Sequence, residues 1–227
     1  VNIATSLKMQ LNQITKEFIE EILKDYALIE GDELNQKLLK LFNEFSDDTN
    51  KFEVMIKVAA LNKIYSTAIT NINPVVEKIN ETSKNYKFEN SIDYVRFVDK
   101  IANVKWKNER GAEFERTNLS FASKYTHFIS NFDVPIYDSY IWIVIKGYLG
   151  QSNPEKLSFR APKNYEEFFS TFTEFKIAFN LENYDNYKID KFLWTYGRNM
   201  IFDIVREKEI NLEAAKSELK KRLKSIT

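Results

Sequence analysis

The 227-residue sequence contains no cysteine and a single histidine, His127. Disulfides and thiolate zinc sites are therefore excluded, and one imidazole leaves little material for a metal centre. Glycine (5) and proline (4) are scarce, which argues against low-complexity disorder. The sequence has no run of 18 apolar residues, so no transmembrane helix is expected. The first residues lack the pattern of a signal peptide. These absences predict a cytoplasmic protein with no metal site and no membrane partner.

The sequence has no net charge, with 33 basic and 33 acidic residues, but the charges are unevenly distributed. Residues 1–57 hold 7 Lys against 11 acidic residues, whereas residues 100–124 hold six basic residues against three acidic ones. The segment 216–224 carries five positive charges and one negative charge. A neutral protein can bind nucleic acid through such local patches, since only the contact face needs a positive potential. Each patch is equally consistent with a solvated helix face.

Apolar residues recur at three- and four-residue spacing along nearly the whole chain, which is typical of amphipathic helices. We expect helices at about 3–27, 34–45, 50–71, 73–83, 91–101, 118–131, 138–149, 164–179, 187–208 and 211–226. Residues 104–116 and 150–162 read as loops, and no strand pairs bounded by Asn-Gly or Asp-Gly turns are evident. The sequence therefore predicts an all-α fold. It suggests an acidic N-terminal lobe (1–85) and a second lobe (86–227), either in contact or as one continuous domain.

One lysine lies in an unusual setting on the helix expected at 118–131. Ser120, Phe121, Lys124, Tyr125 and Phe128 recur at helical spacing, so Lys124 lies beside an aromatic stripe. Packing it there would remove water from its amine and lower the pKa of that amine, which favours the neutral, nucleophilic form. The simpler interpretation is a lysine whose stem packs on apolar surface while its amine stays in water.

An aspartate follows this lysine after a short proline-bearing turn. The segment Pro135-Ile-Tyr-Asp138 leads into the next expected helix, so Asp138 occupies an N-cap position. There it would accept hydrogen bonds from free backbone amides, which favour its charged form. A carboxylate held rigidly in this way suits a group that faces a reacting centre, although many such aspartates are only caps.

The string Ser120-Phe-Ala-Ser-Lys124, followed by Pro135-Ile-Tyr-Asp138-Ser139, resembles a bacterial 8-oxoguanine DNA glycosylase-like group. That group belongs to the helix-hairpin-helix DNA glycosylase superfamily. The string Ile189-Asp-Lys-Phe-Leu-Trp-Thr-Tyr-Gly197 is similar to its C-terminal segment, and the resemblance covers roughly residues 90–200. It implies a helix-hairpin-helix glycosylase-like helical bundle.

The resemblance also implies a chemistry. In that superfamily a lysine attacks the anomeric carbon of a flipped nucleotide, and an aspartate at the head of the following helix assists. These roles fall on Lys124 and Asp138, with a Schiff base that permits strand cleavage. Tyr137, Tyr140 and Trp142 would line the base pocket. Duplex DNA with a flipped base is the implied partner, and no cofactor is implied.

Several residues would contact DNA outside the base pocket. Phosphate contacts are expected from Lys105, Lys107, Arg110 and Arg116 and from the basic C-terminus. Trp106 would stack on a base, or else fix its loop to the core. Arg198 would contact a phosphate, or else satisfy a helix C-terminus.

Two other readings stay open. The hairpin equivalent, Arg116-Thr-Asn-Leu-Ser120, has no glycine, and the lysine-to-aspartate spacing is about one turn shorter than in the better-known enzymes. Both departures favour a non-catalytic module on the same fold that binds nucleic acid or protein. A third reading is a helical interaction protein that uses its acidic N-terminal lobe. His127 is expected to be structural, and Asp47-Asp48 is expected to cap a helix.

Overall fold

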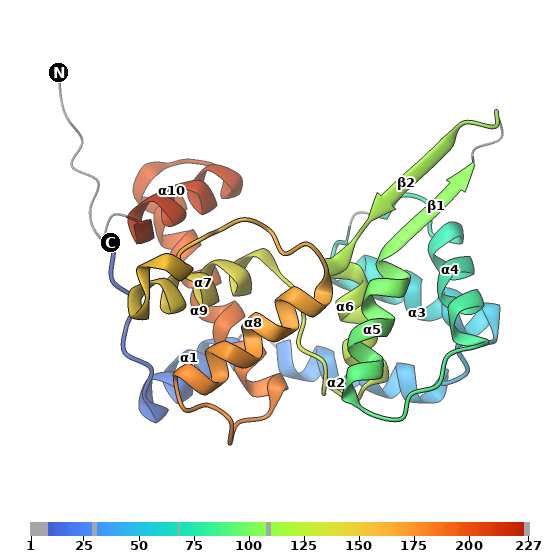
Figure 1. Ribbon diagram of the computed structural model, residues 1–227, viewed down its shortest axis with the longest axis horizontal. Coiled ribbons are helices and arrows are strands. Elements are labelled where there is room, and N and C mark those ends of the chain that lie inside the picture. Colours follow the sequence, from blue (N-terminus) through green and yellow to red (C-terminus); the bar gives the residue numbers. More distant parts are fainter. Residues whose placement is uncertain (1–8, 29–30, 68, 108–109, 225–227) are drawn as a thin grey trace. The chain divides into compact units, whose positions relative to one another are not determined.

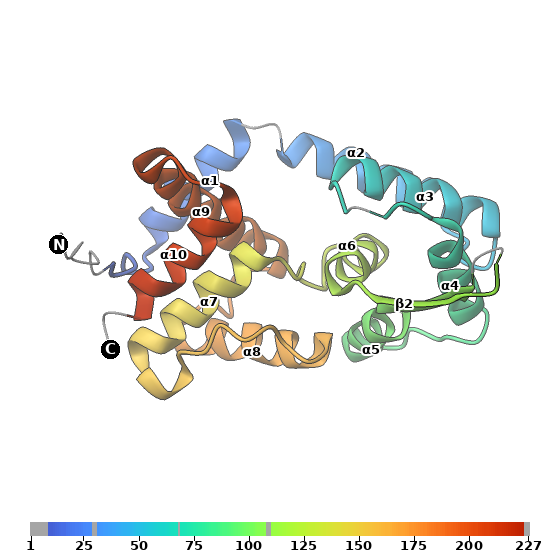
Figure 2. The ribbon, with the colours of Figure 1, turned by 90° about the horizontal axis from the view of Figure 1, so that it is seen from above.

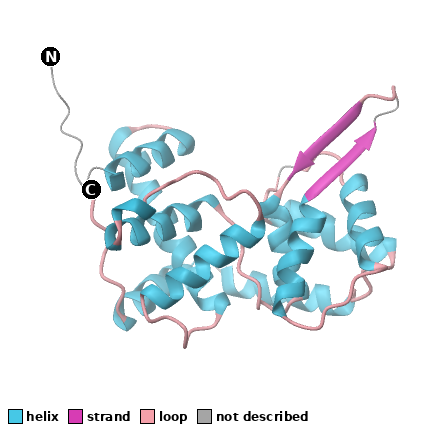
Figure 3. Cartoon of the chain, in the orientation of Figure 1, coloured by secondary structure: helices cyan, strands magenta, loops and turns pink. Residues whose placement is uncertain are grey.

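The computed structural model describes residues 9–28, 31–67, 69–107 and 110–224. Within these ranges the chain forms ten α-helices, one short 3-10 helix (η1) and one two-stranded sheet (Figures 1 and 3). The helices are α1 (Lys16–Leu28), α2 (Gly31–Glu44), α3 (Lys51–Ile64), α4 (Asn73–Ser83), α5 (Ser91–Ala102), α6 (Leu119–Ile129), α7 (Ser139–Ser152), η1 (Pro154–Lys156), α8 (Tyr165–Ala178), α9 (Asn186–Lys208) and α10 (Leu212–Lys224). The strands are β1 (Asn103–Lys107) and β2 (Glu113–Thr117). The predominance of helix confirms the all-α class.

The chain divides into two compact units. Unit 1 comprises residues 1–29, 138–162 and 170–227, and unit 2 comprises residues 30–137 and 163–169. The expected division at residue 85 differs from this grouping, because α2 to α6 build one unit and the chain then returns to the unit of α1. No helix in the described ranges combines the length and the apolarity needed to cross a bilayer.

Unit 1 is organised around α9, which packs against α1, α7 and α10. The close approach of α9 to α7 depends on Gly197. A Cβ atom at this position would lie 3.1 Å from the backbone oxygen of Tyr140 and 3.0 Å from a methyl group of Val144. Any larger side chain would therefore push the two helices apart.

Unit 2 contains α5 and α6 side by side, with α3 packed against α4 and α6 (Figure 2). Its core holds an ion pair as well as aromatic rings. Lys57 is fully buried and pairs with Asp48, which also accepts a hydrogen bond from the Tyr125 hydroxyl. The Lys57 amine lies 5.5 Å from the ring centre of Phe42 and 5.6 Å from that of Tyr125. Asp48 therefore anchors a buried charge, whereas the sequence predicted only a helix cap.

The prediction of a loop at 104–116 is wrong, because β1 and β2 form an antiparallel hairpin between α5 and α6 (Figures 1 and 3). Trp106 pairs with Phe114, and their rings stack with centroids 5.4 Å apart. On the opposite face, Lys105 and Lys107 pair with acidic residues of β2. These cross-strand pairs stabilise strands that lack a tight Asn-Gly turn.

Two helix ends also differ from expectation. The first helix begins at Lys16, and the described residues before it, 9–15, are not helical. The third helix ends at Ile64 and not near residue 71. The remainder of that segment runs as a connection to α4, where Pro74 occupies the first turn.

Candidate functional site

The N-terminal half of α6 positions Lys124. Asn118 caps this helix, with its side-chain oxygen accepting the Phe121 backbone N–H at 2.9 Å. Lys124 is 6% exposed, so the side chain does not extend into solvent as a typical surface lysine would. All residues from Phe121 to Phe128 are buried, so α6 is enclosed on every face and not along its aromatic stripe alone.

The neighbours of the Lys124 amine include both oxygens of Ser120 and an aromatic ring, with the Ser120 backbone oxygen 3.5 Å from Nζ. Lys124 Nζ donates to Ser120 Oγ at 2.5 Å and lies 5.5 Å from the ring centre of Tyr65. The Tyr65 hydroxyl in turn donates to the buried side chain of Asn35 at 2.5 Å. Ser120 itself is only partly buried. We refer to Lys124, Ser120, Tyr65 and Asn35 as the Lys124 cluster.

Asp138 caps α7, with Oδ1 accepting the Tyr140 backbone N–H at 2.7 Å. It belongs to unit 1, whereas Lys124 belongs to unit 2, so the pairing of the two residues stays a prediction. Tyr137, the residue before Asp138, is fixed on unit 2. The Tyr137 backbone N–H donates to Ser123 Oγ at 2.9 Å, which attaches this end of the turn to α6.

The three aromatic residues expected in a base pocket have separate roles. The Tyr137 ring packs edge-on against Phe168 in unit 2, with centroids 5.3 Å apart. Trp142 is 5% exposed in unit 1, and its indole N–H donates to the Arg160 backbone oxygen at 2.9 Å. Tyr140, also in unit 1, lies 5.2 Å from the Lys216 amine, and partial burial raises the pKa of its hydroxyl. A base pocket formed jointly by these three therefore also stays a prediction.

The hairpin divides the expected DNA-contacting residues between its two faces. Lys105 pairs with Glu115 at 3.3 Å, and Lys107 pairs with Glu113 at 2.9 Å. These carboxylates offset the two positive charges that were expected to contact phosphate. Residues of one strand alternate between faces, so Trp106 projects to the other face.

The remaining expected contacts are dispersed. Arg110 is exposed near the hairpin turn. Arg198 lies on α9 in unit 1, with its guanidinium 4.8 Å from the ring centre of Phe202 and 5.8 Å from that of Trp194. Its contact with aromatic faces gives it a packing role within unit 1.

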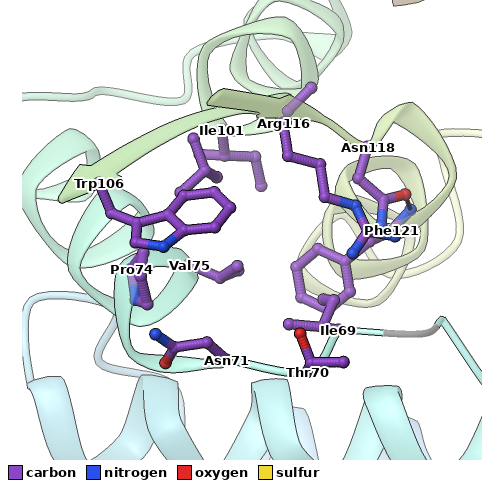
Figure 4. Close-up of a pocket in the computed structure, with 12 residues that line it drawn as sticks. Ile69, Thr70, Asn71, Pro74, Val75, Ile101, Trp106, Arg116, Asn118 and Phe121 are labelled. Atoms are coloured by element: carbon purple, nitrogen blue, oxygen red, sulfur yellow. Dashed lines mark hydrogen bonds between the residues drawn. The ribbon is translucent and has the colours of Figure 1, made fainter. Parts of the chain in front are cut away.

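A pocket opens in unit 2 beside the hairpin (Figure 4). Its empty space is about 450 Å³ with the open mouth included. Trp106 and Arg116 lie on opposite sides of it, and Thr70 and Asn71 lie along a third edge (Figure 4). Phe121 of α6 completes the wall on the Arg116 side. Lys124, one turn further along α6, is not among the lining residues.

A family model, HI_0787_N, described as an N-terminal domain, matches residues 11–133. The chain belongs to this family. The HI_0787_N match contains the pocket and the whole Lys124 cluster, and it ends before Asp138. No curated protein and no solved structure matches the chain. No group of three or more potential metal ligands occurs among the described residues.

Sequence reasoning named Trp106 and Arg116 but missed the other pocket residues. Thr70 and Asn71 precede α4, and Asn118 begins α6, so the pocket joins segments more than 40 residues apart. One signal was present in the sequence: the alternation Val104-Lys-Trp-Lys107, which places the apolar residues on one face of a strand.

Proposed function

We propose that this member of the HI_0787_N family is a cytoplasmic DNA base-excision glycosylase and lyase of the helix-hairpin-helix type. Lys124 is the nucleophile, and Asp138 is its electrostatic partner. The observation that carries the proposal is the burial of Lys124, a residue 6% exposed whose amine donates to the hydroxyl of Ser120. A lysine held away from bulk water loses its proton more readily, and the neutral amine is the nucleophilic form.

The chemistry begins with an extruded nucleotide that reaches the amine through the partly exposed Ser120 side. The Lys124 nitrogen forms a bond to C1′ as the C1′–N bond to the base breaks, and the base leaves with that electron pair and takes up a proton. Opening of the sugar converts the adduct into an iminium, and elimination then cleaves the strand on the 3′ side. The negative charge of Asp138 stabilises the positive charge that develops at C1′.

The anchoring of Tyr137 to Ser123 supports this assignment. It fixes the residue before Asp138 to the same helix that carries Lys124. The packing of α6 against α5 is a further support, because it holds the helix that carries Lys124 in the core of unit 2.

A second candidate is a non-catalytic module that binds nucleic acid on the same scaffold. The observation that favours it is the pocket between Trp106 and Arg116, which does not include Lys124. In this case the Lys124–Ser120 contact is only a satisfied buried hydrogen bond. Such a module would lose affinity for DNA steeply as salt rises, and it would release no base.

Borohydride trapping separates the two candidates. The substrates are labelled duplexes that carry 8-oxoguanine or an abasic site, and the variants are wild type, Lys124→Gln and Lys191→Gln. Lys191 is the matched control, because it is also buried, at 5% exposure, but lies on α9. We expect a covalent adduct with wild type and Lys191→Gln and none with Lys124→Gln. Salt-sensitive DNA binding without any adduct, even on the abasic duplex, would reject the lysine mechanism and favour the binding module.

A further inference from the structure

We propose that the pocket between Trp106 and Arg116 binds one unpaired nucleobase together with its attached phosphate, at a place distinct from the Lys124 cluster. The ligand is either a nucleotide within single-stranded DNA or a free mononucleotide. Binding of single-stranded DNA rests on the proposed function, whereas binding of a free mononucleotide does not.

The walls of the pocket suit a flat aromatic ring. Trp106 is held in place by its stack on Phe114, whose ring lies within 15° of parallel. Phe121 is 2% exposed and rigid in the core on the other side of the pocket. Val75 and Ile101 form an apolar back wall (Figure 4). A base that enters between these walls stacks on the indole and excludes water from its faces.

The charge in the pocket selects an anion. Among the described residues that line the pocket, Arg116 carries a charge, and none is an aspartate or glutamate. The lysines of β1 cannot supply this charge, since Lys105 and Lys107 pair with Glu115 and Glu113 on the other hairpin face. The planar guanidinium matches two phosphate oxygens at once. Arg116 is exposed, so a phosphate attached to the base can stay at the mouth of the pocket.

The remaining polar groups fit the edge of a base. Thr70 and Asn71 are exposed along one side of the pocket, and a side-chain amide can both donate to and accept from the edge of a nucleobase (Figure 4). The Asn118 amide lies next to Arg116, where its oxygen already accepts the Phe121 N–H. Two exposed hydrogen-bonding side chains, one cation and two aromatic walls together describe a nucleotide better than an apolar ligand.

The test isolates one base. Fluorescence anisotropy measures the affinity of the protein for two labelled oligonucleotides. One consists of abasic tetrahydrofuran residues alone, and the other is the same strand with a single thymine at its centre. Thymidine 5′-monophosphate is titrated separately by calorimetry. The pocket variants are Trp106→Leu and Arg116→Gln. The matched controls are Phe52→Leu, at an exposed aromatic residue on α3, and Lys40→Gln, at an exposed lysine on α2. Circular dichroism verifies that every variant is folded.

We expect the single thymine to raise the affinity of wild type about tenfold, in the range that base stacking produces. Trp106→Leu removes this preference, and Arg116→Gln weakens binding of both strands. The two control variants behave as wild type. A folded Trp106→Leu variant that keeps the preference overturns the proposal. The proposal is also overturned if wild type neither prefers the thymine strand nor binds the mononucleotide.

The outcomes also separate this proposal from the enzymatic one. Mononucleotide binding that depends on Trp106, with no binding to either strand or to duplex DNA, leaves the pocket in place and rejects the glycosylase. A Lys124 adduct on DNA with no thymine preference and no mononucleotide binding supports the glycosylase and rejects the pocket.

Discussion

Lys124 Nζ lies 2.5 Å from Ser120 Oγ, one helical turn earlier on α6. The spacing of four residues places both side chains on the same face of the helix. Both residues lie within unit 2 and within the segment that matches the HI_0787_N family. The contact gives the amine a neutral hydrogen-bonding partner and a fixed direction, which a nucleophile requires.

Substitution of Ser120 tests whether this contact positions the amine. We expect Ser120→Ala to slow borohydride-trapped adduct formation by about tenfold, the effect of losing one hydrogen bond to a charged or polarised group. Ser120→Thr keeps the hydroxyl and is expected to restore most of the rate. Equal trapping rates for wild type and Ser120→Ala, measured on an abasic duplex, would mean that Ser120 has no positioning role.

The two faces of the hairpin are expected to differ in their contribution to DNA binding. Arg116→Gln should reduce the slope of log affinity against log salt by about one, as expected for one lost phosphate contact. Lys107→Gln should leave the slope nearly unchanged, because Glu113 already offsets that lysine. Anisotropy titrations at several salt concentrations measure both slopes. A larger effect from Lys107 would place the DNA on the opposite face.

The buried ion pair of unit 2 makes a strong prediction about stability. Asp48→Asn leaves the fully buried Lys57 without its counter-charge, and we expect a loss of about 3 kcal/mol in the free energy of unfolding. The double variant Asp48→Asn/Lys57→Met should recover much of this loss, because the uncompensated charge is gone.

The matched control for this pair is Glu33→Gln, which breaks the exposed Lys37–Glu33 pair on α2. Its expected cost is much smaller than that of Asp48→Asn, because solvent screens an exposed ion pair. Denaturant unfolding of wild type and the three variants measures the loss, its recovery and the cost of the control. If Asp48→Asn and Glu33→Gln cost the same, Lys57 is not held by Asp48 in solution.

The attachment of α10 to α9 is expected to weaken in acid. Arg222, 9% exposed in its side chain, donates to Glu207 at 2.8 and 2.9 Å and to Glu218 at 3.2 Å. The hydrogen bond from Arg222 lowers the pKa of Glu207 below its ordinary value of 4.5, and the bond from Lys208, followed by that from Arg222, lowers the pKa of Glu218. Both carboxyl groups have a lower pKa in the folded protein than in the unfolded chain. Their contribution to stability is therefore present above pH 4.5, and it is lost as the pH falls through their folded-state pKa values.

Thermal unfolding at pH 7 and pH 3 of wild type, Arg222→Met and Arg206→Met tests this relationship. Arg206 is the control, because its pair with Asp203 is largely exposed. Arg222→Met should lower the melting temperature at pH 7 and flatten the acid dependence, whereas Arg206→Met should follow wild type. If the melting temperature of Arg222→Met falls between pH 7 and pH 3 as much as that of wild type, Glu207 and Glu218 do not cause the loss of stability in acid.

The helical framework was largely predictable, because apolar periodicity and caps are local properties. The α4 bounds follow from Asn73-Pro74, and α7 follows directly after its cap, Asp138. The alternation over 104–107 indicates one strand, but the hairpin was missed because its stability also needs cross-strand pairs such as Trp106–Phe114 that no local pattern specifies. The sequence suggested two lobes, but it could not say which segments form each unit, since that depends on which helices pack together.

The site was predictable only in part. The aromatic stripe of α6 predicted apolar side chains beside Lys124, but its burial also depends on packing that encloses every face of α6. The capping role of Asp138 follows from its position before α7. The Ser120 contact is local and could have been inferred from the four-residue spacing. The pocket beside Trp106 could not, because Thr70 and Asn71 reach it from a distant connection whose course depends on the packing of α3 and α4.

The most direct test identifies the residue that carries the adduct. After borohydride reduction on an abasic duplex and digestion of the DNA and protein, mass spectrometry locates the modified lysine. Trypsin normally cuts after Lys124, but an alkylated Lys124 resists cleavage and leaves the peptide Thr117–Lys146, in which it is the one internal basic residue apart from His127. The account predicts the sugar remnant on this peptide. A remnant on another lysine, or on none while DNA is bound, would contradict it.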